Sequence, residues 1–496
     1  MMIKPYLGGG PLLRPLPKKP YSADEILKTL DEYSAHDLDP HSGRMWAHSY
    51  ETGLSELLDV ARKAYVKFMD KTMLNFTVYP SILRMENEVV AIMASFMHGD
   101  ERTVGSFTYG GTESIILAVK AARDHYRHVK KGQEPPEMVL PSTAHPAFYK
   151  AADFLGLKVV KVPVDPGTLK AVPDEVNEAI GERTALIVGS APNYPYGTVD
   201  PIKALGEIAL DRGVWLHVDA CIGFVLPFFK KLGVNVPDFD FSVEGVNSLS
   251  VDLHKYGYAP KGASVVLYRS EELRLYHIYV NSVWPGYPLV NTVVLSTRSA
   301  GPLAAAWAVL HYLGEEGYLE MAKRVLKAKE TLLKGLPEVG FEVLGQPESS
   351  LMAFTSQEVN IFQLADWLKG HGWYVQVQPG SRALGVPPSL HLTISPVHDK
   401  LANAFLEALA KGVEEVKALP GTGAEELMEE LNIAEMPIET LEEAMPMLLK
   451  AIGIGEGEAP AEMALINELI YLVPPEIVEL VFRHAVSELF KPAKQK

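Results

Sequence analysis

The chain contains very little cysteine and no long apolar run. Cys221 is the single cysteine among 496 residues, so an intrachain disulfide is impossible and the composition is typical of a reducing compartment. No run approaches the roughly eighteen apolar residues that a membrane-spanning helix requires, and residues 1–20 hold too many prolines and glycines for a signal-peptide core. We therefore expect a cytoplasmic protein without a transmembrane segment.

Basic residues are also outnumbered by acidic ones. The formal net charge is −16, and the segment 421–462 holds eleven glutamates against one lysine. Basic clusters elsewhere are short and isolated, which argues against binding to nucleic acid or to an anionic membrane surface. We interpret the acidic segment as a solvated amphipathic region that closes over the C-terminal domain. The expected partners are small molecules, with no nucleic acid among them.

Short apolar runs alternate with helical patterns from about residue 75 to residue 300. The apparent strands are "EMVLPST", "KVVKVPVD", "TALIVGSAP", "VWLHVDAC", "SLSVDLH" and "ASVVLYR". This alternation predicts an α/β fold in which helices cover both faces of a largely parallel sheet.

The texture of the sequence divides the chain into three regions. Residues 1–74 combine an extended arm with helices, the first of which starts with capping-box spacing between Ser22 and Glu25. Residues 75–302 form the large domain. Residues 303–496 begin with a long helical stretch and continue as a smaller α+β domain with an acidic tail.

Two motifs in the large domain place uncharged groups at the start of a helix. In "TYGGTES", Gly110, Gly111 and Thr112 precede a helix, and the amides at such a start can hold a phosphate. In "PSTAHPAFYKA", His145 lies at a strand-to-helix junction and offers a flat ring. Taken singly, each motif is more often a turn or a surface feature.

Two further motifs place charge where strands end. "VWLHVDACIGF" ends an apolar strand with Asp219, and a buried carboxylate needs a partner. "DLHKYGYAPKG" puts His254 and Lys255 where a strand gives way to a loop, with Lys261 six positions later. Reactive groups of α/β enzymes commonly occupy such strand ends.

Together the four motifs predict a site for pyridoxal 5'-phosphate. A lysine forms an imine with the aldehyde of this cofactor, and a carboxylate beside the pyridine nitrogen keeps that nitrogen protonated. An imidazole can stack on the ring, and glycine amides can hold the phosphate. The ring then accepts the electrons that are released at the α-carbon of the substrate.

The motifs "GGTES", "HVDAC", "HKYGYAPKG" and "SAPNYPYGTVDPI" resemble those of the group II pyridoxal phosphate-dependent decarboxylases, and specifically the sphingosine-1-phosphate lyase branch. The resemblance covers roughly residues 42–418. It implies the fold type I of pyridoxal phosphate-dependent transferases, with a mostly parallel seven-stranded sheet in the large domain and a smaller α+β domain. It also implies a homodimer with shared active sites.

The resemblance assigns roles to individual positions. Lys255 would be the imine-forming lysine, Asp219 the partner of the pyridine nitrogen, and His145 the stacking ring. The residues implied in phosphate binding are Gly111, Thr112, His254 and, reaching into the site of the neighbouring subunit, Thr297 in "LSTRSAG". No metal ligand is expected, since His125 and His128 read as solvated helix residues.

On the substrate side, the resemblance implies Tyr50 in "WAHSYETG", Asn75 in "NFTVYP" and Lys261. Lys261 would serve as an acid/base or as an anchor for an anion. A charged Lys261 would also help to keep the amine of Lys255 unprotonated by like-charge repulsion. The histidine that accompanies Asn75 in the lyase pattern is absent here.

Three functions follow as hypotheses. The first is retro-aldol cleavage of a β-hydroxy amine, with or without a phosphate, to an aldehyde and a small amine. The second is decarboxylation of an amino acid such as tyrosine, aspartate or glutamate. The third is binding of pyridoxal phosphate without catalysis, which retention of the lysine and both ring contacts disfavours.

Overall fold

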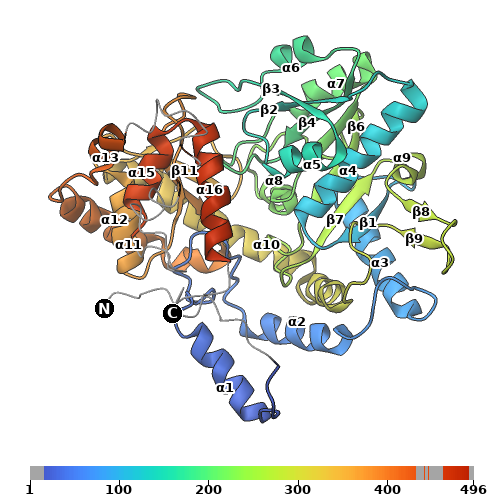
Figure 1. Cartoon of the computed structure of the whole chain (residues 1–496), viewed down its shortest axis with the longest axis horizontal. Coiled ribbons are helices and arrows are strands. Elements are labelled where there is room, and N and C mark those ends of the chain that lie inside the picture. Colours follow the sequence, from blue (N-terminus) through green and yellow to red (C-terminus); the bar gives the residue numbers. More distant parts are fainter. Residues whose placement is uncertain (1–15, 432–440, 442–444, 446–461, 491–496) are drawn as a thin grey trace.

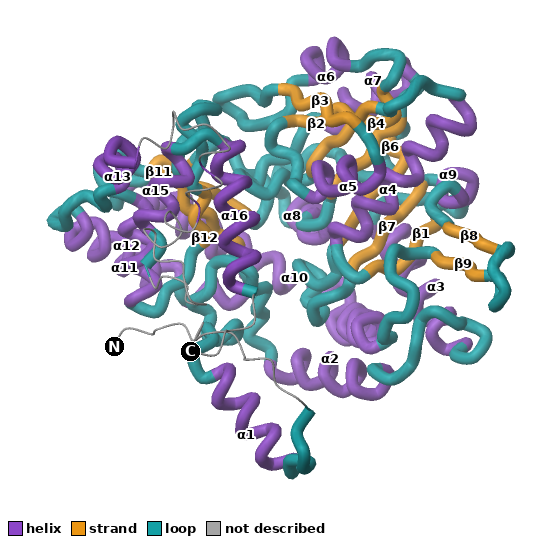
Figure 2. Tube along the Cα trace, in the orientation of Figure 1, coloured by secondary structure: helices purple, strands orange, loops and turns teal. Residues whose placement is uncertain are grey.

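The computed structural model describes residues 16–431, Leu441, Met445 and residues 462–490. Residues 1–15 of the predicted N-terminal arm and most of the predicted acidic segment lie outside the described residues. Figures 1 and 2 show two sheet-based lobes, with the long helix α10 (Gly301–Glu338) running between them.

The larger lobe is built on a seven-stranded sheet with the order β1-β7-β6-β5-β4-β2-β3. Strands β2 to β6 are parallel, whereas β7 runs antiparallel to both of its neighbours, β6 and β1. The predicted α/β fold with a mostly parallel seven-stranded sheet is therefore confirmed. The strands are β1 (Val104–Thr108), β2 (Glu137–Pro141), β3 (Lys158–Val162), β4 (Thr184–Ser190), β5 (Trp215–Asp219), β6 (Val246–Val251) and β7 (Ser264–Tyr268).

Helices cover both faces of this sheet because alternate side chains of a strand point to opposite faces. In β4, Ile187 belongs to one buried cluster while Leu186 and Val188 belong to another. The second cluster includes the helices α4 and α5, which pack against each other. The helices of this lobe are α3 (Pro80–Phe96), α4 (Gly111–His125), α5 (Ala147–Leu155), α6 (Pro173–Ala179), α7 (Ile202–Arg212), α8 (Leu226–Lys231) and α9 (Glu271–Leu275), with short turns at η1 (Tyr126–Lys130) and η2 (Gly223–Val225).

The smaller lobe contains an antiparallel sheet with the order β10-β11-β13-β12. Its strands are β10 (Glu342–Val343), β11 (Leu351–Thr355), β12 (Gln376–Gln378) and β13 (Ser389–Thr393). Its helices are α11 (Ile361–Gly370), α12 (Ala402–Val416), α13 (Ala424–Leu431), α15 (Ala464–Leu472) and α16 (Pro475–Leu489), with a short turn η3 (Pro396–Lys400).

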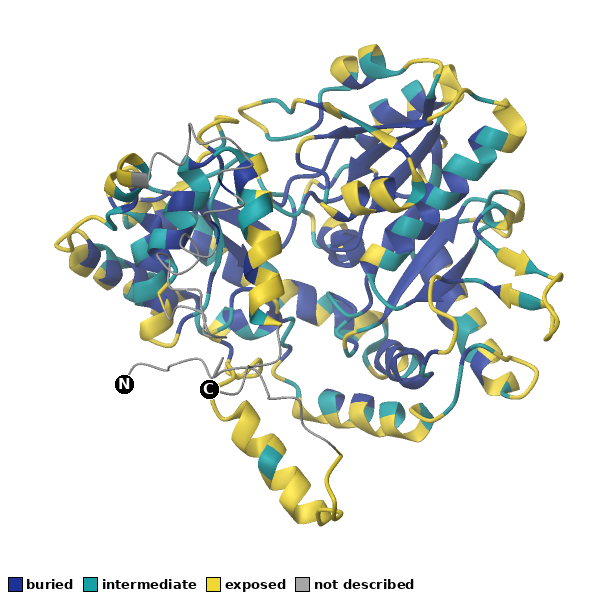
Figure 3. Cartoon of the chain, viewed as in Figure 1, coloured by how far each residue is buried: buried dark blue, intermediate teal, exposed yellow. Residues whose placement is uncertain are grey.

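Three elements lie at the periphery. Helix α1 (Ala23–Ser34) starts with the predicted capping box, in which Ser22 and Glu25 bond each other's backbone amides. Helix α2 (Ser55–Phe68) packs along α10. The hairpin of β8 (Tyr279–Asn281) and β9 (Leu289–Asn291) projects from the large lobe, and Figure 3 shows both α1 and this hairpin as mostly exposed. Among the described residues, no helix combines the length and the apolar character needed to cross a membrane.

Candidate active site

A cavity of about 610 Å³ opens where the parallel strands of the large sheet end. Six of the residues predicted for the cofactor line it, namely Gly111, Thr112, His145, Asp219, His254 and Lys255. They come from the end of β5 and from the segments that follow β1, β2 and β6. The carboxyl ends of parallel strands meet at one edge of a sheet, which explains why residues so distant in sequence share one cavity.

The start of α4 forms one wall of the cavity. Gly110 has a φ of 138°, a conformation that favours glycine, and it leads into the helix that begins at Gly111. A Cβ atom on Gly111 would lie 2.7 Å from Asp252 Oδ2 and 2.7 Å from Cys221 Sγ. The backbone amides of Gly111 and Thr112 precede the first intrahelical bonds, so they are available to an anion.

Asp219 is the last residue of β5 and is 6% exposed. The amide of Cys221 donates to its Oδ1 at 3.0 Å, and Ser250 on the neighbouring strand β6 donates to the same atom at 3.5 Å. These contacts fix the orientation of the carboxylate, which also lines the cavity. Two positions earlier in β5, burial lowers the pKa of His217 to about 4, so the His217 ring is neutral.

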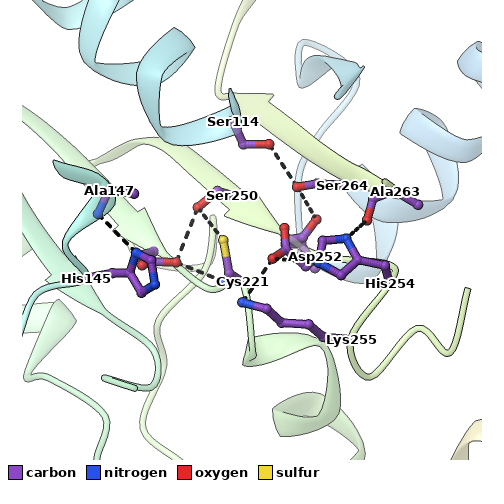
Figure 4. A network of polar contacts seen from close by, with 12 residues as sticks. Ser114, His145, Ala147, Cys221, Ser250, Asp252, His254, Lys255, Ala263 and Ser264 are labelled. Carbon is purple, nitrogen blue, oxygen red and sulfur yellow. Dashed lines mark hydrogen bonds and ion pairs between the residues drawn. The ribbon is translucent and has the colours of Figure 1, made fainter. Parts of the chain in front are cut away.

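His145 stands on the turn between β2 and α5. The amide of Ala147 donates to its Nδ1 at 3.1 Å (Figure 4), which leaves the proton of the neutral ring on Nε2. Burial lowers the pKa of His145, although the negative charge of Asp219 partly opposes this effect. A neutral imidazole with a fixed orientation is suited to stacking on a planar ring.

Lys255 lies in the tight turn that follows β6. The amide and Nδ1 of His254 both approach the carbonyl of Ala263, at 2.9 and 2.8 Å, which holds the turn against the loop before β7. The amine of Lys255 forms an ion pair with Asp252, with 3.0 Å between Nζ and Oδ2 (Figure 4). His254 Nε2 lies 3.7 Å from the same oxygen.

The predicted effect of Lys261 on Lys255 is wrong. Burial alone would lower the pKa of the Lys255 amine, but the attraction of the negative charge of Asp252, with a smaller contribution from Asp219, raises it. Repulsion between the two amines is mutual, but at Lys255 the attraction of the carboxylates outweighs it. Desolvation of the amine by the residues around it, followed by the positive charge of Lys255, lowers the pKa of Lys261 to about 8, although much of the Lys261 side chain is exposed.

Tyr50 and Lys261 lie beside this turn but outside the residues that line the cavity. Lys261 Nζ donates to the carbonyl of His48 at 3.2 Å and lies 4.8 Å from the centre of the Tyr50 ring. The Tyr50 ring packs edge-on against Tyr256 at 5.1 Å. Burial raises the pKa of Tyr50, so its hydroxyl keeps its proton.

Asn75 and Thr297 do not line the cavity of their own chain. Both are exposed. Asn75 Oδ1 accepts from the amides of Thr77 and Val78, which makes a local turn. Thr297 follows a segment held by Glu113 of α4, whose Oε1 accepts from the amide of Leu295 at 3.1 Å.

The structure adds residues that the sequence motifs did not single out. Asp252 lies closest to the Lys255 amine, Ser250 supports Asp219, and Tyr194 faces His145 edge-on with 6.4 Å between ring centres. For Asp252, a signal was present, because an aspartate three positions before a lysine at a strand end is within reach of that lysine. For Tyr194, nothing in the sequence of the loop after β4 indicated that its ring lies next to His145.

Residues 20–357 match the model of the pyridoxal-dependent decarboxylase conserved domain. A sphingosine-1-phosphate lyase from Arabidopsis thaliana is 42% identical over 70% of this chain, and the match spans 64% of that enzyme, just under two thirds of its length. A probable L-tyrosine/L-aspartate decarboxylase from Methanothermobacter thermautotrophicus is 30% identical, over 72% of this chain and 94% of that protein. The solved structure of a sphingosine-1-phosphate lyase from Burkholderia pseudomallei superposes with a TM-score of 0.77 at 34% identity, covering 86% of this chain and 97% of that one.

Proposed function

The chain belongs to the pyridoxal-dependent decarboxylase family and is a pyridoxal phosphate-dependent lyase; from this premise we propose that it cleaves the Cα–Cβ bond of a β-hydroxy amine. The reaction is a retro-aldol cleavage that yields an aldehyde and a small amine. The relatives named sphingosine-1-phosphate lyases support a phosphorylated long-chain amine as the substrate. Family membership also sets aside the non-catalytic hypothesis.

The residues of the cavity fit pyridoxal phosphate. Asp252 and Cys221 already fill the position that a Cβ atom would take on Gly111, so only glycine fits at this point of the cavity wall. Asp219 uses Oδ1 for internal contacts while its carboxylate lines the cavity. A lysine, a carboxylate, a neutral imidazole and free helix amides are the set of donors and acceptors that this cofactor requires.

Each of these residues has a proposed task. When bound, pyridoxal phosphate supplies an electron sink for the bond that breaks at the α-carbon. Lys255 would attach the cofactor, and Asp219 would hold a proton at the pyridine nitrogen. The amides of Gly111 and Thr112, together with His254, would bind the phosphate group. His145 would fix the plane of the ring, because its own orientation is set by the Ala147 amide.

The observation that carries the substrate proposal is the position of Lys261 next to Tyr50. Its amine lies over the Tyr50 ring, in the same turn region as Lys255, and its hydrogen bond to His48 is to a neutral carbonyl. Such a cation is suited to the anionic end of a phosphorylated amine. The protonated hydroxyl of Tyr50 would donate a hydrogen bond to the same group.

The bond that breaks is tested by the products. We expect that the loaded enzyme, supplied with a phosphorylated β-hydroxy amine, releases an aldehyde in stoichiometric amount and no carbon dioxide. Lys255→Ala should abolish the release, and borohydride should trap a reduced pyridoxyl adduct on Lys255 of the unaltered chain. Mass spectrometry of peptides locates the adduct, and coupled assays quantify both products.

The similarity to a probable tyrosine/aspartate decarboxylase keeps one alternative open. If carbon dioxide forms from an amino acid in a panel of tyrosine, aspartate and glutamate, while no aldehyde forms from any β-hydroxy amine, decarboxylation replaces the retro-aldol proposal. Both reactions use the same cofactor residues, so only the products distinguish them.

We also propose that the enzyme works as a homodimer with shared active sites. Thr297 and Asn75 lie outside the cavity of their own chain, which is compatible with a contribution of both residues to the active site of a neighbouring subunit. Large apolar side chains are exposed nearby on the β8–β9 hairpin, for example Val283 at 89%. A cytoplasmic location stays a prediction from the composition.

A further inference from the structure

Asp252 is a buried carboxylate beside the reactive amine. It is 1% exposed and follows directly after β6. Its Oδ2 pairs with Lys255 at 3.0 Å, whereas its Oδ1 has no hydrogen-bond partner among the described residues. The nearby hydroxyl of Ser264 donates to the carbonyl of Val251 at 3.1 Å.

A carboxylate in this position depends strongly on a neighbouring cation. Removing a charged group from water is costly unless an opposite charge compensates for it. The second candidate cation, His254, lies at the longer distance of 3.7 Å, and burial lowers the pKa of its ring. The charge of the Lys255 ammonium is therefore the main compensation for Asp252.

The same contact constrains Lys255. An amine condenses with an aldehyde, losing one water molecule as the C=N bond forms, only after the ammonium ion has given up its proton. Resting on the proposed function, we propose that Asp252 is a positioning residue that holds Lys255 as its ammonium ion whenever this lysine is not bonded to the cofactor. Asp252 thereby sets the pH range in which the chain takes up pyridoxal phosphate.

Other titratable groups also face the Lys255 amine. The groups that can carry negative charge, besides Asp252, are Asp219 at the end of β5, Cys221 just after it and Tyr50 from the N-terminal segment. The groups that can carry positive charge are His145, His254 and Lys261. Tyr194, from the loop after β4, also faces the amine. Asp252 differs from all of these by its direct ion pair at 3.0 Å.

The test measures cofactor uptake rather than turnover. Cofactor-free chain is mixed with saturating pyridoxal phosphate between pH 6.5 and 9.5, and the absorbance of the imine is followed in time. For the unaltered chain we expect the rate to rise about tenfold per pH unit without a plateau, since the neutral amine is a minor species throughout. Asp252→Asn should raise the rate at pH 7 at least about tenfold and bring a plateau at lower pH.

Asp240→Asn is the matched control. Asp240 is also buried, at 3% exposure, and pairs with His98 at 2.7 Å, and neither of these residues lines the cavity. Its variant should reproduce the pH profile of the unaltered chain. Identical profiles for Asp252→Asn and the unaltered chain would overturn the inference, as would an equal shift in the Asp240 variant.

A second measurement uses only the unaltered chain, so it tests the inference even if the Asp252→Asn variant fails to fold. Competitive acetylation of the unaltered cofactor-free chain, read by peptide mass spectrometry, reports the pKa of each lysine. Lys255 should react later in a pH series than the exposed lysines, and a pKa below theirs would overturn the inference. If the unaltered chain forms no imine at any pH, the proposed function fails instead, and this result is distinguishable from an unchanged variant profile.

Discussion

Lys255 and Lys261 are six positions apart and have opposite electrostatic surroundings. Lys255 faces the carboxylate of Asp252, whereas Lys261 faces a carbonyl oxygen and the Tyr50 ring. The first lysine is thus stabilised as a cation, and the second is a weaker cation that titrates near physiological pH. Their different surroundings suit different tasks, attachment of the cofactor and recognition of the substrate.

The lowered pKa of Lys261 predicts a pH-dependent affinity for an anionic substrate. Lys261 is positively charged below a pH of about 8 and becomes neutral above it. We expect KM for the phosphorylated amine to rise above this pH by up to about tenfold per pH unit, while kcat changes little. Steady-state kinetics between pH 7 and 9.5 measure both quantities.

Lys261→Arg is the control for this prediction. An arginine stays charged throughout the pH range, so its KM should lack the rise that the unaltered enzyme shows. Ionisation of the substrate affects both enzymes equally and cancels in the comparison. Parallel profiles would mean that Lys261 does not bind the anionic group.

Sequence motifs indicate candidate reactive residues more readily than they indicate how these residues shift one another's pKa values. Lys255 and Asp219 stand out because each places a charge at the end of an apolar strand. The pKa values depend on neighbours that only the folded chain assembles, as in the contact of Lys261 with His48, 213 positions away. The error about the two lysines arose because the two like charges were weighed without Asp252, which lies three positions before Lys255 and pairs with it.

At the scale of the elements, the start of α4 joins several parts of the site. Its amides face the cavity, Gly111 packs on Asp252 and Cys221, and Glu113 holds the segment that leads to Thr297. The hydroxyl of Ser114 bonds that of Ser264 in β7 at 2.8 Å, which fixes the helix to the sheet. A change at this helix start should therefore affect cofactor binding directly.

Gly111→Ala is expected to weaken binding of pyridoxal phosphate at least about tenfold, because the added methyl group requires Asp252 and Cys221 to move within a packed interior. Fluorescence titration of the cofactor-free chain measures this affinity. Gly181→Ala is the matched control, since no atom lies within 4 Å of the Cβ position there. Equal affinities in the two variants would show that the helix start is not the phosphate seat.

Most elements of the large lobe could be predicted because buried parallel strands are continuous apolar runs. All six predicted strands are present, at bounds within a few residues. Strand β1 was missed, since "VGSFT" is short and holds Gly105, Ser106 and Thr108. The antiparallel direction of β7 was also not predicted, because burial on both faces gives the same pattern in either direction.

At the scale of the whole molecule, the proposed homodimer predicts complementation between two inactive variants. Lys255→Ala lacks the attachment point, and Thr297→Glu should repel the phosphate in the neighbouring subunit's site. In a mixed dimer, one site would combine Lys255 of one chain with Thr297 of the other and be intact. Refolding or co-expressing the two variants should therefore restore activity to about a quarter of that of the unaltered enzyme per chain, as expected for random pairing in a two-fold dimer.

Activity assays of the mixture and of each variant alone measure this effect, and native mass spectrometry verifies that mixed dimers form from the 54.5 kDa chains. Mixed dimers without activity would show that Thr297 does not serve the neighbouring site.

The residues implied in the site form two groups that lie on different segments of the chain. Six residues implied in holding the cofactor line the cavity at the ends of the sheet, whereas Tyr50, Asn75, Lys261 and Thr297 belong to segments outside that lining. Mutations at the substrate positions Tyr50, Asn75 and Lys261 can therefore accumulate without a change in the six residues that line the cavity. Small evolutionary steps can then change which bond is cleaved or which substrate is preferred. A family whose members carry out different reactions on one scaffold is the expected result.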